Sequence, residues 1–411
     1  MPLTIEGLRS LCPTRSGADY VLLPQNLLTS GGVLLEDFET TTGWTVNNGS
    51  LANDATHFKT GTQSVEFTSV VGGLARATKG VSWARPSNQE VRLWAYVADA
   101  SKVVAGTMQL MLASHGDMTP RFHIYPTIQQ GWNLFSFKNA DWTLLGGMTW
   151  AQTIIYVRLQ FNGATGEQGV VSYDTLVSDV VAQPAIVLTF DDAHLSVYSQ
   201  AYSCMRTRNI PGTFYVWTAN VGQTSNVTTA HLREMQAAGW TIANHTQTHA
   251  DLTALTQGQV EAELSAGKGD LEGWGIAGNG PLHVAYPGGM YNDTVLAAMA
   301  AQGMLTGRHI SLPAYPVLPF AEPYRIPVGK QFGNTVSLAN ALAWVDSVIA
   351  RRELGIALFH TLVESPSSST QWGIADFQAF CQYLATNRVP CITIDQAYQL
   401  QNGAVRCCRA R

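Results

Sequence analysis

The feature that most constrains the fold of this chain is a change of residue pattern at Gln183-Pro184. Beyond it, short apolar runs typical of strands, such as 185–190 and 391–394, alternate with longer segments of helical periodicity, such as 374–386, as far as about residue 400. Repeated strand–helix alternation predicts parallel strands joined by crossover helices. The segment holds roughly 220 residues, the size of a (β/α) barrel or an open doubly wound sheet. No GxGxxG follows its first strand, which argues against dinucleotide binding.

The chain before this boundary has a different pattern. From Gly32 to Val181 it consists of short runs with period-two alternation, such as 90–97 and 154–161, separated by turn-forming residues. Such runs predict an antiparallel β-sandwich. We therefore expect four parts: an attachment segment at 1–33, a β-sandwich at 34–182, a (β/α) barrel at 183–400 and a C-terminal tail at 401–411.

Charge and hydropathy exclude two classes of partner. The 411 residues include 24 Lys+Arg and 29 Asp+Glu, a net charge of −5, so no overall basic charge exists to hold nucleic acid. No apolar run reaches the roughly 18–20 residues that span a bilayer, so membrane insertion is not expected. The N-terminal stretch lacks the basic-then-apolar order of a secretory signal. The compartment stays open, and release by lysis or within a larger particle is an alternative to secretion.

Ionisable side chains directly follow three of the expected strands. They are Asp191 and Asp192 after the first strand, His245 and His249 after the third, and His360 after a late one. Because the carboxyl ends of parallel strands open on one site, we expect these side chains to converge. Two histidines four apart plus one carboxylate suit a divalent transition metal with open positions. The second aspartate of the pair could then act as a base toward water.

Each of these elements has an ordinary explanation when taken alone. An Asp-Asp pair after a strand is commonly a loop or a helix cap, and an HxxxH pair is mostly surface or core histidine. A lone histidine such as His360 is more often a hydrogen-bonded buried imidazole. Their conjunction at successive strand ends is hard to obtain by chance, so a functional site is the preferred interpretation.

A resemblance to a known family rests on three stretches in order: Thr189-Phe190-Asp191-Asp192, His245-Thr246-Gln247-Thr248-His249 and Leu358-Phe359-His360. They are similar to the first, second and fifth motifs of the polysaccharide deacetylases, the NodB-homology fold of carbohydrate esterase family four. The resemblance covers about 184–400. It implies a distorted (β/α) barrel that removes acetyl groups from polysaccharides, most often N-acetyl groups of N-acetylglucosamine. It also implies roles for five residues: Asp192, His245 and His249 as ligands of a divalent metal, commonly zinc, Asp191 as general base and His360 as general acid.

The third family motif, Arg-x-Pro-Tyr-Gly, is replaced here by Ala-Tyr-Pro-Gly-Gly at 285–289. The backbone N–H of Gly288 can still serve as oxyanion donor, because that role needs no side chain. The motif arginine steadies the catalytic aspartate in the family, and here Arg325 either replaces it or forms a structural ion pair. His194 is interpreted as a loop residue, with a contact to substrate or to the metal ligands as the alternative. The expected substrate-binding residues are Tyr286, Pro287, Arg325 and Leu358.

The β-rich segment has a weaker resemblance of its own. The stretches at 35–45 and 59–65 are similar to jelly-roll carbohydrate-binding modules. Four tryptophans could stack on sugar rings, namely Trp44, Trp83, Trp94 and Trp132. The alternative is that they are core residues, as most tryptophans in strands are. The alternative is an assembly module that docks the enzyme onto a larger structure, with 1–33 as its attachment segment, as in phage tail proteins.

The leading hypothesis is a metal-dependent polysaccharide deacetylase acting on extracellular or cell-surface polysaccharide. An esterase that removes O-acetyl groups at the same site is the alternative within enzymes. A non-catalytic carbohydrate-binding or phage tail protein with a decayed barrel is the third hypothesis. The intact acids and histidines oppose it, and the missing motif arginine favours it. An acetylated polysaccharide is the expected partner, and oligomer formation or attachment to a virion stays open.

Overall fold

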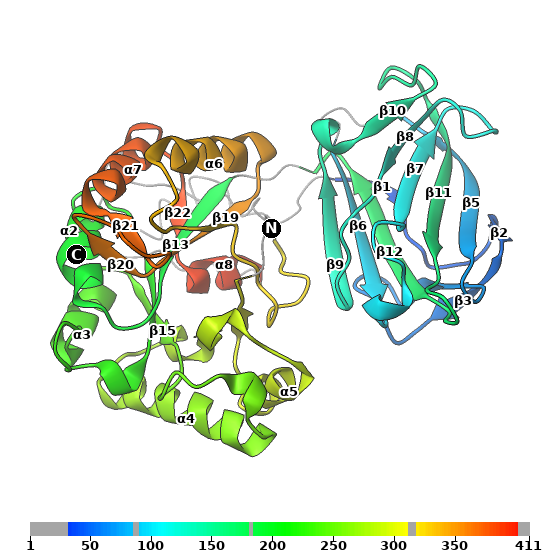
Figure 1. Ribbon diagram of the computed structural model, residues 1–411. Helices are drawn as coiled ribbons and strands as arrows, with labels where there is room; N and C mark the ends of the chain where they lie inside the picture. The colour runs from blue at the N-terminus through cyan, green and yellow to red at the C-terminus, as the bar shows by residue number, and fades with distance from the viewer. Residues whose placement is uncertain (1–31, 85–89, 181–183, 311–317, 402–411) are drawn as a thin grey trace, which may run out of the picture. The chain divides into compact units, whose positions relative to one another are not determined.

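The computed structural model describes residues 32–84, 90–180, 184–310 and 318–401, which divide into two compact units (Figure 1). The first unit ends at residue 180 and the second begins at 184, where the sequence pattern changes. Residues 1–31 of the predicted attachment segment and 402–411 of the predicted tail lie outside the described residues. No helix in the described ranges is both long and apolar enough to cross a membrane.

The first unit consists of two antiparallel six-stranded sheets. One has the order β3 (Gly49–Asp54), β4 (Ser64–Ser69), β12 (Val170–Ser178), β6 (Val91–Val97) and β9 (Gly131–Phe137), with β1 (Val33–Glu36) also paired to β12. The other has the order β10 (Thr143–Leu145), β8 (Arg121–Ile124), β7 (Gln109–Ala113), β11 (Ile154–Asn162), β5 (Leu74–Trp83) and β2 (Trp44–Asn47). One apolar cluster takes residues from both sheets. This arrangement is in keeping with a sandwich, and the jelly-roll assignment stays a prediction.

Period-two alternation gives each strand of the first unit one core face. In β11, Val157 and Leu159 are buried whereas Arg158 is partly exposed. In β5, Ala75 and Ala77 are buried in the same cluster. Because successive side chains point to opposite faces of a sheet, the residues between them face away from the core. The outward face of this sheet is considered further below.

The four tryptophans considered for sugar stacking divide into two pairs. Trp44 and Trp83 pack against the apolar cluster of the first unit. Trp94 and Trp132 meet edge to face, with ring centroids 5.9 Å apart, and the ammonium of Lys59 lies 5.1 and 4.8 Å from their rings. Trp44 and Trp83 are therefore core residues, whereas the ammonium of Lys59 lies against Trp94 and Trp132.

The second unit contains an eight-stranded sheet. Its order is β17 (Thr306–Arg308), β16 (His283–Ala285), β15 (Thr241–Asn244), β14 (Thr213–Val216), β13 (Ala185–Phe190), β19 (Leu354–Phe359) and β18 (Lys330–Gln331), with β22 (Cys391–Ile392) also paired to β13. Every pair in this sheet is parallel, which fits the predicted distorted (β/α) barrel. A separate two-stranded sheet is formed by β20 (Thr361–Val363) and β21 (Gln371–Gly373).

Helices follow most strands of this sheet and flank it in Figure 1. They are a π-helical turn (Val197–Tyr202) leading into α2 (Ser203–Arg206), then α3 (Thr229–Ala237), α4 (Gln257–Gly273), α5 (Asp293–Ala301), α6 (Leu338–Arg351), α7 (Ile374–Thr386) and α8 (Ile394–Gln401). The strand expected at 391–394 ends at Ile392, and Ile394 begins α8. The reason is local, because the Thr393 hydroxyl accepts a hydrogen bond of 3.2 Å from the N–H of Gln396 and so begins the helix.

Strand register places the ends of β13 and β19 side by side. Phe190 pairs with Phe359, and their rings stack at 5.3 Å within the core shared with the helices. On the other side, Val216 pairs with Asn244, and further along the sheet Ala285 pairs with Arg308. The residues that directly follow these positions therefore lie along one edge of the sheet.

A pH dependence of stability follows from His283 in β16. This ring is fully buried between Thr306, 2.9 Å from Nδ1, and Asp395, 3.2 Å from Nε2. Burial lowers its pKa, although Asp395 opposes the shift. In the unfolded chain the imidazole of His283 takes up a proton below about pH 6.5, whereas in the folded chain it does so only at lower pH. Acidification in this range therefore lowers the free energy of unfolding by up to about 1.4 kcal/mol per pH unit. We expect His283→Gln to flatten melting temperature against pH between about 6.5 and 5. His231→Gln on α3 is the control, and equal slopes for wild type and His283→Gln would refute this explanation.

Candidate metal centre and active site

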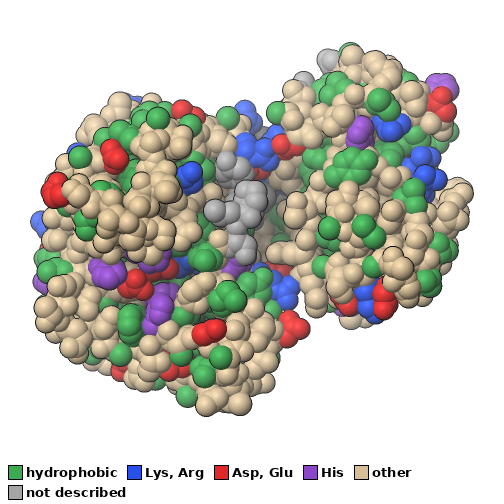
Figure 2. All heavy atoms as spheres, viewed as in Figure 1, with side chains coloured by type: hydrophobic (Ala, Val, Ile, Leu, Met, Phe, Trp, Pro, Cys, Tyr) green, Lys and Arg blue, Asp and Glu red, His purple; other side chains and the backbone are tan. Residues whose placement is uncertain are grey.

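Asp192, His245 and His249 come together at the carboxyl ends of β13 and β15. Nε2 of His249 lies 3.5 Å from Oδ1 of Asp192, and Nε2 of His245 lies 3.7 Å from the same oxygen. One ligand atom from each residue lies within 4.8 Å of the other two. Ligands about 2 Å from a tetrahedral zinc stand roughly 3–3.5 Å apart, so these three groups fit one small cation. Histidine and acidic side chains lie next to each other on the surface of this unit in Figure 2.

His245 is held in the form that can bind a metal. The ring is 2% exposed, and its Nδ1 lies 2.8 Å from the carbonyl oxygen of Ala285. Only a protonated Nδ1 can donate to a carbonyl, so Nε2 carries the lone pair that faces Asp192. Burial lowers the pKa of His245, against the opposing effect of the two nearby aspartates. The neutral imidazole is the form that metal binding requires.

Asp192 is the carboxylate of the set and also contacts His194. Its Oδ2 lies 3.2 Å from Nε2 of His194, while Oδ1 faces the two other histidines. Burial by itself would raise the pKa of Asp192. The hydrogen bond from His194 and the imidazoles of His245 and His360 outweigh that effect and hold the pKa well below its usual range. The carboxylate is therefore ionised at neutral pH. Of the two interpretations of His194, the structure favours the contact with a candidate ligand.

The backbone around this group lies in an unusual conformation. Asp192, Thr246 and His249 have φ of 72°, 63° and 60°, the left-handed region that costs a non-glycine residue about 1–2 kcal/mol. Hydrogen bonds hold it there: the Trp217 N–H donates to the Asp192 carbonyl at 3.0 Å, and the His249 N–H donates to the Thr246 hydroxyl at 3.1 Å. Backbone strain of this kind concentrates at functional sites, because the surrounding structure must impose it.

Asp191 lies next to this group and is held by an arginine. Its side chain is buried, and Oδ2 accepts a hydrogen bond from Nη2 of Arg308, the last residue of β17. Arg308 is 1% exposed, and its guanidinium lies 5.2 Å from the ring of Tyr215. Oδ1 of Asp191 has no hydrogen-bond partner among the described residues. One carboxylate oxygen is thus fixed, and the other is left to accept a proton.

The arginine beside Asp191 is Arg308, which corrects the suggestion that Arg325 takes the place of the motif arginine. Nη2 of Arg325 instead lies 3.9 Å from Oδ1 of Asp293, as the ion-pair alternative expected. Arg308 was missed because β17 has only three residues and was not predicted. Had β17 been predicted, the place of Arg308 at its carboxyl end would have been the signal.

His360 and Gly288 occupy two further strand ends. His360 follows β19, whose pairing with β13 brings it next to Asp191, and it is close enough to lower the pKa of Asp192. Its Nδ1 is buried without a hydrogen-bond partner among the described residues, a cost that a bound water or substrate would relieve. Gly288 is exposed in the turn after β16, with φ of 61°.

The expected substrate-binding residues are less accessible than the sequence analysis assumed. Tyr286 is buried, and its hydroxyl donates to the Tyr324 carbonyl at 2.8 Å. Leu358 is fully buried in β19, and Pro287 is buried as well. Tyr286 packs in an apolar cluster with residues of α4 and α5, and Leu358 is covered within β19. Trp217, which the sequence analysis did not single out, lies with its ring 4.9 Å from that of His249.

Comparison with known families matches the same part of the chain. Residues 179–307 match the family model described as polysaccharide deacetylase. The matched segment contains Asp191 and the three candidate ligands, and it ends before Arg308 and His360. The chain therefore contains a domain of the polysaccharide deacetylase family.

Individual relatives are 25–30% identical to this chain over the segments that match. The chitooligosaccharide deacetylase of Sinorhizobium fredii is 29% identical over 122 residues, 29% of this chain and 54% of that protein. The poly-beta-1,6-N-acetyl-D-glucosamine N-deacetylase of Staphylococcus epidermidis is 28% identical over 158 residues, 35% of this chain and 53% of that protein. The chain thus spans about half the length of these two relatives. A solved family 4 carbohydrate esterase from Streptomyces lividans, in complex with acetate, is 21% identical, with coverage of 51% of this chain and 93% of that chain and a TM-score of 0.38.

Proposed function

We propose that this protein is a metal-dependent hydrolase that removes acetyl groups from a polysaccharide, in the first place N-acetyl groups of N-acetylglucosamine-type sugars. The observation that carries the proposal is the group formed by Asp192, His245 and His249, with Asp191 beside it. The family match supports the reaction, and one relative is named for a polymer of N-acetyl-D-glucosamine. The substrate would be an extracellular or cell-surface polysaccharide.

In this proposal Asp192, His245 and His249 hold the metal through one carboxylate oxygen and two Nε2 atoms. A divalent metal, which we propose to be zinc, supplies polarisation of a carbonyl and activation of water when bound. This set of donor atoms fits such a metal, because Nδ1 of His245 donates a hydrogen bond to the carbonyl of Ala285 and Nε2 is left free to bind.

The other residues of the site move protons and hold charge. Oδ1 of Asp191 accepts a proton from the attacking water, while Arg308 keeps the carboxylate in place. The water oxygen adds to the acetyl carbon, and the backbone N–H of Gly288 stabilises the negative charge that develops on the carbonyl oxygen. His360 donates a proton to the amide nitrogen as the C–N bond breaks, so that acetate and the free amine leave.

The test is acetate release by the purified protein from N-acetylated chitooligosaccharides. We expect about one equivalent of bound divalent metal, loss of activity on its removal by a chelator, and recovery on addition of zinc. Full activity of the metal-free protein would contradict the proposal. No acetate from any N- or O-acetylated glycan would favour the non-catalytic binding protein instead.

Removal of O-acetyl groups at the same site is the alternative reaction. An alkoxide leaves more readily than an amine anion, so the amide reaction depends more on proton donation to the leaving group. We expect His360→Ala to reduce acetate release from N-acetylated substrates by about a hundredfold or more, and from O-acetylated xylan by less. Activity of the wild type on O-acetylated xylan alone would establish the esterase.

A further inference from the structure

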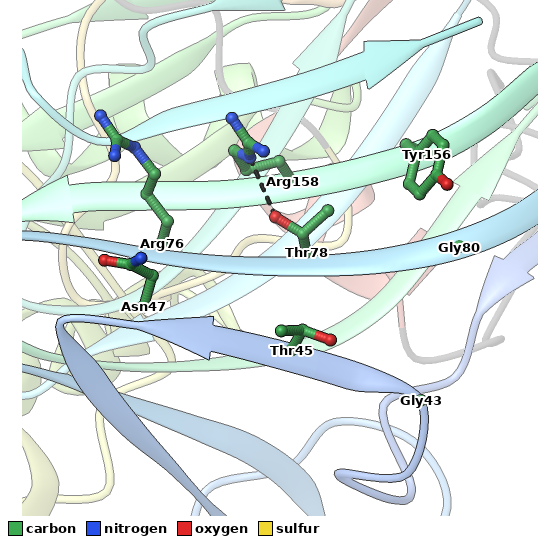
Figure 3. Close-up of a pocket in the computed structure, with 8 residues that line it drawn as sticks. All are labelled: Gly43, Thr45, Asn47, Arg76, Thr78, Gly80, Tyr156 and Arg158. Atoms are coloured by element: carbon green, nitrogen blue, oxygen red, sulfur yellow. Dashed lines mark hydrogen bonds between the residues drawn. The ribbon is translucent and has the colours of Figure 1, made fainter. Parts of the chain in front are cut away.

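The outward face of one sheet in the first unit carries an open cavity of about 370 Å³ (Figure 3). Its walls come from β2, β5 and β11, and the residues used below are Thr45, Asn47, Arg76, Thr78, Tyr156 and Arg158. Register aligns them across the sheet, because Thr78 pairs with Thr45 on one side and with Arg158 on the other. They stand at alternate positions of their strands, so they share the face that points away from the core.

Positive charge on this face lacks acidic neighbours within the sheet. Arg76 and Arg158 extend from neighbouring strands toward the same side in Figure 3. Nε of Arg158 donates to the Thr78 hydroxyl at 2.9 Å, and Arg121 in β8 donates to the Met118 carbonyl at 2.9 Å, so the hydrogen-bond partners are neutral. None of the six strands of this sheet contains an aspartate or glutamate. In the other sheet, by contrast, four strands carry acidic residues.

The positive charges on this face act on one another at Arg158. Burial lowers its pKa first, and the charges of Arg76 and Arg121 lower it further. Guanidinium groups held together without a counter-charge repel each other, and a bound anion would remove that repulsion. The whole chain has a net charge of −5, so this face is a local exception to the overall charge.

The same cavity offers groups that suit a sugar. Tyr156 is partly exposed, and glycines lie beside its ring: a Cβ on Gly80 or Gly116 would stand 3.9 or 3.4 Å from ring atoms. Thr45 and Asn47 are exposed and provide a hydroxyl and an amide. An aromatic ring next to neutral hydrogen-bonding groups binds the apolar face and the hydroxyls of a sugar together.

We propose that this face of the first unit binds an acidic polysaccharide. Arg76 and Arg158 pair with carboxylate or sulfate groups on its sugars, and Tyr156 packs against a sugar ring. Guanidinium groups suit this role, because their planar donors match both anions with two hydrogen bonds. The competing class is nucleic acid, whose binding depends on many phosphate contacts, whereas this cavity offers two arginines beside neutral groups that suit sugar hydroxyls. The site is independent of the hydrolytic centre, so either proposal can fail without the other.

The experiment measures binding of the full-length protein to four probes by calorimetry, at low and at physiological salt. Hyaluronan presents carboxylates, chondroitin sulfate presents carboxylates and sulfates, dextran is neutral, and a single-stranded oligonucleotide presents phosphodiesters. The test variant combines Arg76→Gln with Arg158→Gln. The charge-matched control combines Lys102→Gln with Arg206→Gln, two exposed cations that pair with glutamates elsewhere on the chain. Thermal unfolding checks that the variants are folded.

We expect the wild type to bind hyaluronan, chondroitin sulfate or both, more weakly at higher salt, and to prefer them to dextran. The test variant should raise the dissociation constant at least about tenfold, whereas the control should change it less than about twofold. Tyr156→Ala should weaken binding without changing its salt dependence. If the double variant does not fold, Arg76→Gln alone serves the same comparison.

Four results would overturn the proposal. They are no binding to either acidic glycan, equal binding to dextran, an equal loss in test and control variants, and tighter binding of the oligonucleotide than of both glycans. The last result would assign the face to nucleic acid instead. Binding of only one acidic glycan supports the proposal and identifies which anion the arginines accept.

Discussion

Replacing His245 with alanine is expected to remove bound metal from the protein and to lower acetate release by at least about a thousandfold. In the proposed site the ring would supply one of three ligand atoms, Nε2, which is left free because Nδ1 donates to the carbonyl of Ala285. A site that loses one of three protein ligands binds its metal far more weakly, and the reaction then lacks both carbonyl polarisation and water activation. The measurements are metal content by elemental analysis and acetate release under zinc-free conditions.

The matched control for this prediction is His231→Ala. His231 lies in the first turn of α3, where it contacts the Thr228 backbone and not the metal group. We expect the His231→Ala variant to retain its bound metal and its acetate release. Metal bound to His245→Ala at the wild-type level would show that the three residues are not the ligands. Loss of activity with metal retained would assign His245 a role other than ligation.

Replacing Arg308 with methionine is expected to destabilise the protein by about 3–5 kcal/mol and to reduce acetate release about a hundredfold or more. Asp191 is buried, and Arg308 is the cation on its Oδ2. Without it, a buried carboxylate loses its counter-charge and its fixed position. Urea unfolding measures the first effect, and the rate of acetate release by the remaining folded protein measures the second.

Two further variants separate Arg308 from a merely structural arginine. Arg206→Met removes an exposed arginine that pairs with Glu234 at 3.2 Å, and it should cost less than about 1 kcal/mol because exposed ion pairs contribute little. The double variant Arg308→Met with Asp191→Asn should be more stable than Arg308→Met alone, because it also removes the uncompensated charge. Additive losses in this double-mutant cycle would contradict the pairing.

Long periodic segments of the second unit were predictable, whereas short ones were not. The strand at 185–190 and the helix at 374–386 have the predicted bounds. Their apolar patterns span enough residues to distinguish a strand from a helix. β17 and β18 have only three and two residues, which is too short to show any period. The strand expected at 391–394 was cut short by α8, whose start depends on one threonine cap.

The site divides in the same way between sequence and tertiary structure. Residue types and spacing indicated His245, His249 and one of the two adjacent aspartates, because a metal needs particular donors and these follow strands directly. The choice of Asp192 as the ligand came from the family resemblance. Which arginine meets Asp191 was decided by the tertiary structure, which brings Arg308 at the end of β17 to Asp191 after β13 although three strands lie between them in the sheet. No local pattern encodes that contact, because 117 positions separate the two residues. The cationic face of the first unit arises likewise, since arginines from three separate strands become neighbours only when those strands pair in register.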